Sequence, residues 1–156
     1  METSTVPRAD LRTIVDNVDL VAKMILVVAT KEGGMHPTSS ARAIGASVKY
    51  IGQAKDAYRG NLIVEGTIER ISHWRGETDE RFDYKTIDSA EVMRNVDALA
   101  PVLDAAGEQG AQTKAFLYGI AGSMVNASGS GFMGTGPRLN ENEARFLADL
   151  KAHLGV

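Results

Sequence analysis

The chain has 156 residues, of which 44% are apolar and 24% are charged, as in an ordinary globular domain with one hydrophobic core. This composition excludes a disordered chain and a fibre, and the absence of cysteine excludes disulfides and thiolate zinc sites. The formal net charge of −3 comes without a long basic run, so we expect neither nucleic acid nor anionic lipid as a partner.

The first ten residues, METSTVPRAD, lack the basic and apolar regions of a secretory signal. The longest apolar run, residues 24–29, is far shorter than the roughly 20 residues that cross a bilayer. We therefore expect a soluble, cytoplasmic protein without a membrane span.

The clearest periodicity predicts a helix over residues 11–28, because apolar residues recur there at three- and four-residue spacing. These residues are Leu11, Ile14, Val15, Val18, Val21, Met24, Ile25 and Val28. Arg12, Asp16, Asn17 and Lys23 fall on the other, solvent-facing side of this helix. Residues 24–29 are apolar all round, which predicts that the second half of the helix lies in the centre of the domain.

A second helix is expected after Gly33-Gly34 and Pro37, which end one helix and open the next. Its predicted inner face consists of Ala41, Ile44, Gly45, Val48, Ile51 and Gly52. Its predicted wet face carries Lys49, Gln53 and Lys55. The small residues of the inner face indicate a close approach to a neighbouring helix.

Residues 60–86 are the least regular stretch. Leu62, Val64, Ile68 and Ile71 fit a short helix or an irregular strand pair around Gly66, and we favour the helix. The polar residues 72–81 that follow are expected to form an exposed loop.

Two further helices are expected downstream. Asp88 and Glu91 form a capping-box-like start, and the helix that follows carries Pro101, which we expect to kink or split it. The next helix covers about residues 112–126 and faces inward with Phe116, Leu117, Ile120 and Met124.

A last helix follows the cap formed by Asn140 and Glu143, buries Phe146, Leu147, Leu150 and Leu154, and ends at Gly155. The fold prediction is therefore all-α, an irregular bundle of five to six helices that forms a single domain over residues 1–156.

A glycine-rich loop spans residues 128–137, in which Gly129, Gly131 and Gly134 satisfy the dinucleotide fingerprint G-x-G-x-x-G. That fingerprint functions between a strand and a helix, whereas a helix is expected before this loop. We therefore interpret the loop as a connection between two helices. Its Phe132 and Met133 fold back onto the core or present an apolar tip to a partner.

No set of residues with catalytic spacing stands out. His36, His73 and His153 lie far apart in the sequence, and no G-x-S-x-G element surrounds Ser123. The carboxylates Glu77, Asp79, Glu80 and Asp83 cluster beside Trp74; they fit a solvated loop or, as an alternative, oxygen ligands of a hard cation.

Three short motifs lie in the last third of the chain: residues 114–121 (KAFLYGIA), 125–129 (VNASG) and 139–147 (LNENEARFL). Ala127-Ser128-Gly129, a spacer, and then Leu139, Asn140 and Glu143 follow the order of an A-D-G element, an apolar residue, a helix cap and a closing glutamate. This order resembles the TerB-like family of tellurite-resistance proteins. Residues 29–33 (ATKEG) are a weaker echo of the same element, with Glu32 at the aspartate position.

The resemblance implies an all-helical fold of two degenerate halves, a role in stress responses and protein assemblies, and a divalent cation held by acidic loop residues. Carried onto this sequence, the metal candidates are Glu32, Ser128, Asn140 and Glu143, with Ser128 standing at the aspartate position. Glu143 also has a purely structural explanation, as the partner of Asn140 in the helix cap.

Three functions are therefore considered. The first is a non-enzymatic TerB-like helical module that binds a protein partner and, weakly, a divalent cation. The second is a ligand-free helical scaffold or a homo-oligomerisation module. The third is a small enzyme with a histidine and a carboxylate in a cleft.

Overall fold

The computed structural model describes residues 8–32, 40–74, 79–128 and 141–156. Within these ranges the chain forms six helices. They are α1 (Arg8–Glu32), α2 (Ser40–Ala57), α3 (Leu62–Ser72), α4 (Ser89–Ala105), α5 (Gly107–Ser128) and α6 (Glu141–Leu154). The β pairing among the described residues is an isolated bridge between Asp79 and Phe82. The all-α prediction is confirmed.

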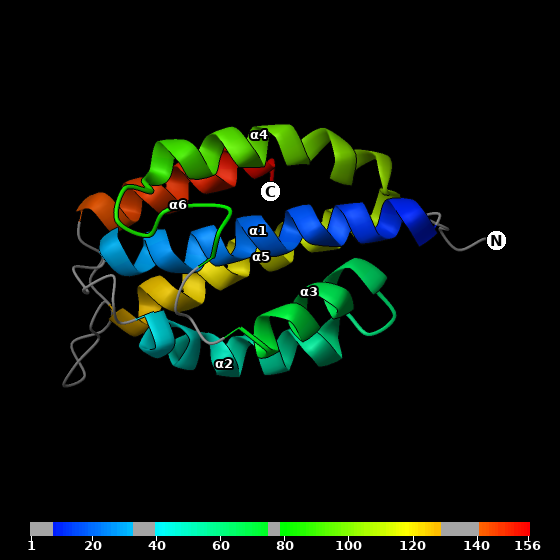
Figure 1. Cartoon of the computed structure of the whole chain (residues 1–156), viewed down its shortest axis with the longest axis horizontal. Helices are drawn as coiled ribbons and strands as arrows, with labels where there is room; N and C mark the ends of the chain where they lie inside the picture. Colours follow the sequence, from blue (N-terminus) through cyan, green and yellow to red (C-terminus); the bar gives the residue numbers. More distant parts are fainter. Residues whose placement is uncertain (1–7, 33–39, 75–78, 129–140) are drawn as a thin grey trace.

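Helix α1 is the central element of the bundle and packs against each of the other five helices. Figure 1 shows α1 and α5 in the middle, with α4 and α6 on one side and α2 and α3 on the other. Residues 24–29 explain the position of α1, because none of them is more than 2% exposed. A helix that is apolar on all sides is stable only when neighbours cover all of it.

The inward faces predicted for the last two helices are observed except at Leu147 of α6, which is only partly buried. Phe116, Leu117, Ile120 and Met124 of α5 are fully buried. In α6, Phe146, Leu150 and Leu154 are buried, and Gly155 ends the helix with a φ of 77°, a conformation that glycine adopts without strain.

Residues 62–72 form the helix α3, so the favoured prediction for this stretch is confirmed and the strand pair is excluded. Asn61 begins the helix, since its side-chain oxygen accepts hydrogen bonds from the backbone N–H groups of Ile63 and Val64. Its amide nitrogen donates to the carbonyl oxygen of Gln109 at 3.0 Å. The same residue therefore caps α3 and ties it to α5.

The start of α4 is confirmed at Asp88, whose carboxylate accepts a hydrogen bond from the backbone N–H of Glu91 at 3.0 Å. Of the two outcomes predicted for Pro101, a kink or a split, the split does not occur, because the helix continues through Pro101 to Ala105. Pro101 is exposed, and its ring therefore meets solvent rather than a neighbouring helix.

The inner face predicted for α2 is wrong at Val48, which is 57% exposed, and at Gly52, which is exposed and would have nothing within 4 Å of an added Cβ atom. The helix instead buries Ser47 and Ala54 and stacks the ring of Tyr50 on Phe116 of α5, with 6.1 Å between the centroids. The inner face of α2 therefore consists of the Tyr50 ring between the smaller residues Ser47 and Ala54, and not of the aliphatic residues that the sequence predicted. The wet face is confirmed, as Lys49, Gln53 and Lys55 are exposed.

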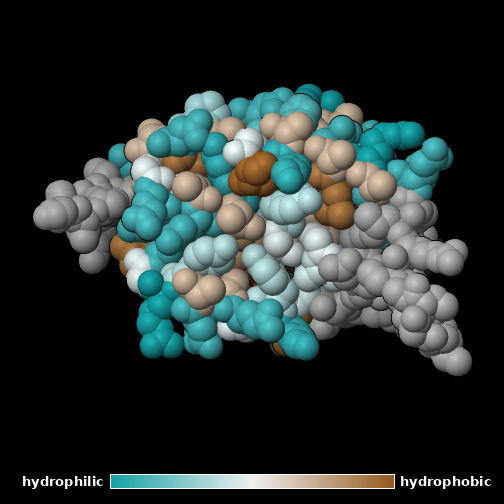
Figure 2. Space-filling view, turned by 180° about the vertical axis from the view of Figure 1, so that it is seen from behind, coloured by the Kyte–Doolittle hydropathy of each residue, from teal (hydrophilic) through white to brown (hydrophobic). Residues whose placement is uncertain are grey.

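None of the helices in the described ranges is long and apolar enough to cross a membrane. Figure 2 shows the face opposite to that of Figure 1, on which apolar residues are scattered among hydrophilic ones. That face shows no single continuous apolar area.

Candidate functional site

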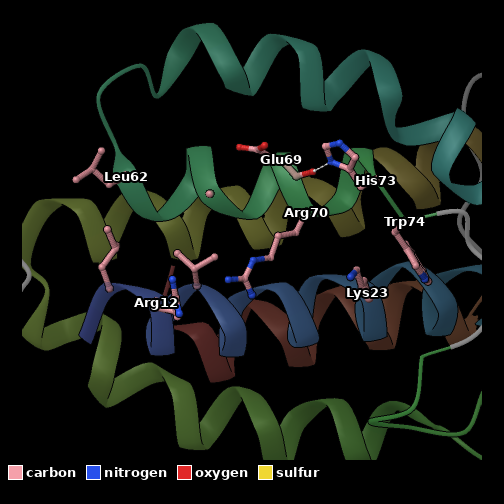
Figure 3. Close-up of a pocket in the computed structure, with 10 residues that line it drawn as sticks. Arg12, Lys23, Leu62, Glu69, Arg70, His73 and Trp74 are labelled. Carbon is pink, nitrogen blue, oxygen red and sulfur yellow. Dashed lines mark hydrogen bonds between the residues drawn. The ribbon is translucent and has the colours of Figure 1, made fainter. Parts of the chain in front are cut away.

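A groove of about 760 Å³ runs between α1 and α3. Figure 3 shows Arg12, Arg70 and Lys23 between the two helices. The residues that line it are Leu11, Arg12, Val15 and Lys23 from α1, Leu62, Gly66, Glu69 and Arg70 from α3, and His73 and Trp74 beyond it. Leu11, Leu62 and Arg12 lie toward one end, and Lys23 and Trp74 lie at the other (Figure 3).

Gly66 sets the distance between the two helices. A Cβ atom at Gly66 would lie 3.1 Å from Cγ2 of Val15, closer than an ordinary van der Waals contact. The missing side chain therefore lets α3 approach α1 at this point. Val15 and Gly66 together form an apolar floor for the groove.

The apolar end of the groove exposes a large side chain to solvent. Leu62, the first residue of α3, is 48% exposed, and Leu11 of α1 is partly buried against the core. Leu62 and the apolar floor together leave apolar surface in contact with water at this end of the groove.

The charged residues of the groove differ in whether they form an ion pair with another residue. Arg70 of α3 forms an ion pair with Asp16 of α1, which joins the two helices. Among the described residues, none forms an ion pair with Arg12, which is exposed. Glu69 projects toward α2 rather than toward α1 (Figure 3).

Lys23 is buried at the other end of the groove and is only 8% exposed. The solvent-facing position predicted for it is therefore wrong. Its ammonium group lies 3.0 Å from Oδ2 of Asp19 and 5.4 Å from the centre of the Trp74 ring. The carboxylate and the ring replace the water that this charge would otherwise need.

The same Asp19 oxygen accepts a hydrogen bond from Arg81 at 2.8 Å, and Arg81 also pairs with Asp79 at 2.7 Å. The four residues Lys23, Asp19, Arg81 and Asp79 form an alternating charge network, which holds the segment after residue 78 on α1. Part of the predicted exposed loop is thus bound to the bundle, and the side chain of Asp79 is only 9% exposed.

The pKa values of Asp79, a member of the network, and of Tyr84, which lies close to it, are both shifted. The hydrogen bonds from Arg81 hold the pKa of Asp79 below its ordinary value of 3.8. Burial, followed by the negative charge of Asp79, raises the pKa of Tyr84 to about 12. The Tyr84 ring stacks on Phe82 and meets Trp74 edge-on, so aromatic packing covers this end of the groove.

The chain matches no family model, no curated protein and no solved structure.

Three of the four predicted metal residues lie within the described ranges, and the fourth lies outside them. Glu32 is the last residue of α1 and Ser128 the last of α5. Asn140 lies outside the described residues. Glu143 is in the first turn of α6 and is 2% exposed. Figure 1 shows that α1 and α5 end, and α6 begins, at the same end of the bundle.

No group of three histidine or acidic side chains that could hold a metal ion is found within the described ranges. This finding covers Asp79, Glu80 and Asp83 of the loop, whereas Glu77 lies outside those ranges. Asp79 is held by Arg81, and Asp83 accepts a hydrogen bond from the backbone N–H of Lys85 at 2.8 Å. The described loop carboxylates therefore do not converge as cation ligands.

The two histidines within the described ranges, His73 and His153, have different partners on different helices. His153 pairs with Asp97 of α4 at 2.6 Å, and His36 lies outside the described residues. His73 lies 2.9 Å through its Nδ1 from the carbonyl oxygen of Glu69. It lines a second, polar cleft of about 490 Å³ between α2 and α3, together with Glu65 and Glu69.

The groove between α1 and α3 was not anticipated from the sequence. Its two sides lie about fifty residues apart in the chain, and helical periodicity does not indicate which helices become neighbours. Two signals were nevertheless present. Gly66 interrupts the apolar spacing of the helix, and Leu62 falls outside the face formed by Ile63, Val64, Ile68 and Ile71.

Proposed function

We propose that this chain is a non-enzymatic helical interaction module that binds a partner protein in the groove between α1 and α3. The observation that carries the proposal is Leu62, which is 48% exposed at the edge of the apolar floor formed by Val15 and Gly66. Water in contact with this surface is released when another apolar group covers it.

The shape of the groove supports a helix as the bound element. Two neighbouring helices form its sides, and a third amphipathic helix fits such a furrow by placing residues i, i+3, i+4 and i+7 on its floor. Helix α3 has 11 residues and is therefore roughly 16 Å long at about 1.5 Å per residue. A partner segment of about three helical turns covers this length.

The test uses Trp74, which is the only tryptophan of the chain and lines the groove. The probe is a neutral amphipathic peptide of about three turns, with leucine at positions i, i+3, i+4 and i+7 and glutamine and alanine elsewhere. We expect a saturable change in Trp74 fluorescence on titration, because the bound peptide alters the solvation of the indole ring.

Two matched variants localise the binding. Leu62→Glu places a charge at the apolar end of the groove, whereas Val102→Glu places one on α4, where Val102 is 37% exposed. We expect L62E to weaken binding at least tenfold and V102E to leave it unchanged. Equal affinity of both variants, or no binding by the wild-type protein, would contradict the proposal.

Light scattering of the wild-type protein and of L62E separates a partner from a second copy of the chain. A dimeric mass that L62E converts to a monomeric one would replace the partner protein with self-association. A monomeric mass for both proteins agrees with the proposal.

A second candidate function is the weak divalent-cation binding that the TerB-like resemblance implies. It is supported by the position of three helix ends, since α1 and α5 end and α6 begins at one end of the bundle (Figure 1). These helices also contact one another. Glu32, Ser128, Asn140 and Glu143 would supply the ligands, all of them oxygen atoms as hard cations prefer.

Isothermal titration with Ca²⁺, Mg²⁺ and Zn²⁺ tests this second candidate. We expect weak binding of at least one cation by the wild-type protein and a loss of binding in Glu32→Gln. Absence of heat with all three cations removes the cation site, and it leaves the groove proposal unaffected.

A further inference from the structure

We infer that the partner segment is acidic, and that one of its carboxylates pairs with Arg12. This inference rests on the proposed function, because it specifies the chemistry of the helix that the groove receives. The occupant is therefore an amphipathic helix with leucine-like residues on one face and an acidic residue beside them.

The charges of the groove lining favour such a partner. Three of the lining side chains are cations, Arg12, Lys23 and Arg70, whereas Glu69 is the single carboxylate. Figure 3 shows that Glu69 projects toward α2, on the far side of α3 from α1. The other carboxylate between α1 and α3, that of Asp16, already pairs with Arg70, so a carboxylate brought to the apolar end of the groove meets Arg12 as its nearest uncompensated charge.

Two of these cations already have a counter-ion within the chain. Arg70 pairs with Asp16, and Lys23 pairs with the buried Asp19. Arg12 has no such ion pair among the described residues, so it is the lining charge that a partner can compensate. A partner that covers Leu62 would also lie close to Arg12, at the apolar end of the groove.

The position of Arg12 restricts where the acidic residue lies in the partner. Arg12 follows Leu11 in the chain, and both residues line the apolar end of the groove. The carboxylate and the apolar anchor of the partner must therefore lie within about one helical turn of each other, at i and i+3 or i+4.

The charge of the whole protein makes this preference specific to the groove. The chain carries a formal net charge of −3, so long-range attraction favours a basic partner. Preference for an acidic peptide can arise only from local contacts. A lysine at the same place would meet Arg12 and Arg70 at close range, and like charges that approach closely repel one another.

The experiment compares three versions of the leucine-faced peptide, which differ only in having glutamate, glutamine or lysine beside the anchor leucine. Affinities are measured from Trp74 fluorescence at low salt. We expect the glutamate peptide to bind about threefold more tightly than the glutamine peptide, and about tenfold more tightly than the lysine peptide. The differences should shrink as salt screens the exposed charges.

Charge reversal of Arg12 supplies the decisive variant. In Arg12→Glu the order of affinities should reverse, so that the lysine peptide binds most tightly. Arg94→Glu is the matched control, because Arg94 is exposed on α4, on the other side of α1 from α3 (Figure 1). It should keep the original order. Circular dichroism of both variants checks that the helices are intact.

The outcomes separate this inference from the proposed function. If no peptide binds, the groove is not a binding site and both statements fail. If all three peptides bind equally, or if R12E leaves their order unchanged, the acidic partner is wrong while the groove remains a binding site. Reversal in R12E but not in R94E supports the inference.

Discussion

The ammonium group of Lys23 lies 5.4 Å from the centre of the Trp74 ring. Both residues line the groove between α1 and α3, and Lys23 also belongs to the network of Asp19, Arg81 and Asp79. The contact therefore joins the proposed binding surface to the charges that hold the segment after residue 78 on the bundle.

Removal of the Lys23 charge should destabilise the protein. Asp19 is 2% exposed, and in Lys23→Met it keeps only Arg81 as a counter-ion, which leaves a buried carboxylate poorly compensated. We expect the free energy of unfolding to fall by about 2 kcal/mol, as measured by urea denaturation followed by circular dichroism.

The double variant Asp19→Asn/Lys23→Met is the control for this prediction. Because it removes the carboxylate together with the ammonium group, it should cost less than the sum of the two single changes. Additive costs would show that Lys23 and Asp19 do not stabilise each other.

The stability of the protein should depend on pH through Asp79. In the folded protein Arg81 holds the pKa of this carboxyl below 3.8, so the ionised form stabilises the fold. This contribution is present above about pH 4 and is lost as the pH falls through the lowered pKa. In Arg81→Ala the loss of stability between pH 6 and pH 3 should be smaller than in the wild-type protein.

Urea midpoints at the two pH values measure this difference, with Arg94→Ala as the control for the removal of an exposed arginine. If R81A and the wild-type protein lose equal stability on acidification, the Arg81–Asp79 pair does not contribute to the pH dependence.

Apolar periodicity was sufficient to predict most of the fold. The central position of α1 follows from residues 24–29, and the inner faces of α5 and α6 follow from their aliphatic and aromatic spacing. These predictions succeeded because burial of one stripe is the main determinant of where a helix packs. The cap at Asp88 succeeded for a local reason, since its hydrogen bond spans only three residues.

The predictions that failed depended on partners distant in the chain. Lys23 was placed in solvent because nothing in α1 indicates that Asp19, Arg81 and Trp74 surround its ammonium group. Val48 was placed in the core because α2 was treated as an aliphatic helix, whereas Tyr50 supplies its contact with α5. The candidate groove was missed for the same reason, because it depends on the pairing of α1 with α3.

The space around two glycines of α5 predicts opposite effects on stability when each is replaced by alanine. A Cβ atom at Gly110 would lie 1.7 Å from the carbonyl oxygen of Leu103, whereas nothing lies within 4 Å of the same atom at Gly122. Gly110→Ala should cost about 3 kcal/mol, because backbone must move. Gly122→Ala should stabilise the helix by about 0.5 kcal/mol. Thermal unfolding of both variants checks the packing of α4 on α5, and similar melting temperatures would contradict it.

Asn61 should contribute to stability in two separable ways. Its oxygen caps α3, and its amide nitrogen donates to Gln109 and Gln112 of α5. Asn61→Ser keeps a capping oxygen but loses the donors, and should cost about 1 kcal/mol, whereas Asn61→Ala loses both and should cost about 2 kcal/mol. Chemical denaturation distinguishes the two variants, and equal costs would mean that the cap adds nothing.

The central claim is that the surface between α1 and α3 binds an amphipathic helix. The most direct measurement is amide chemical-shift mapping of the wild-type protein during titration with the leucine-faced glutamate peptide. The account predicts that the largest changes occur in residues 11–23 of α1 and residues 62–74, and that α4 and α6 remain largely unaffected. Changes centred on α4 and α6, or no changes at saturating peptide, would contradict it.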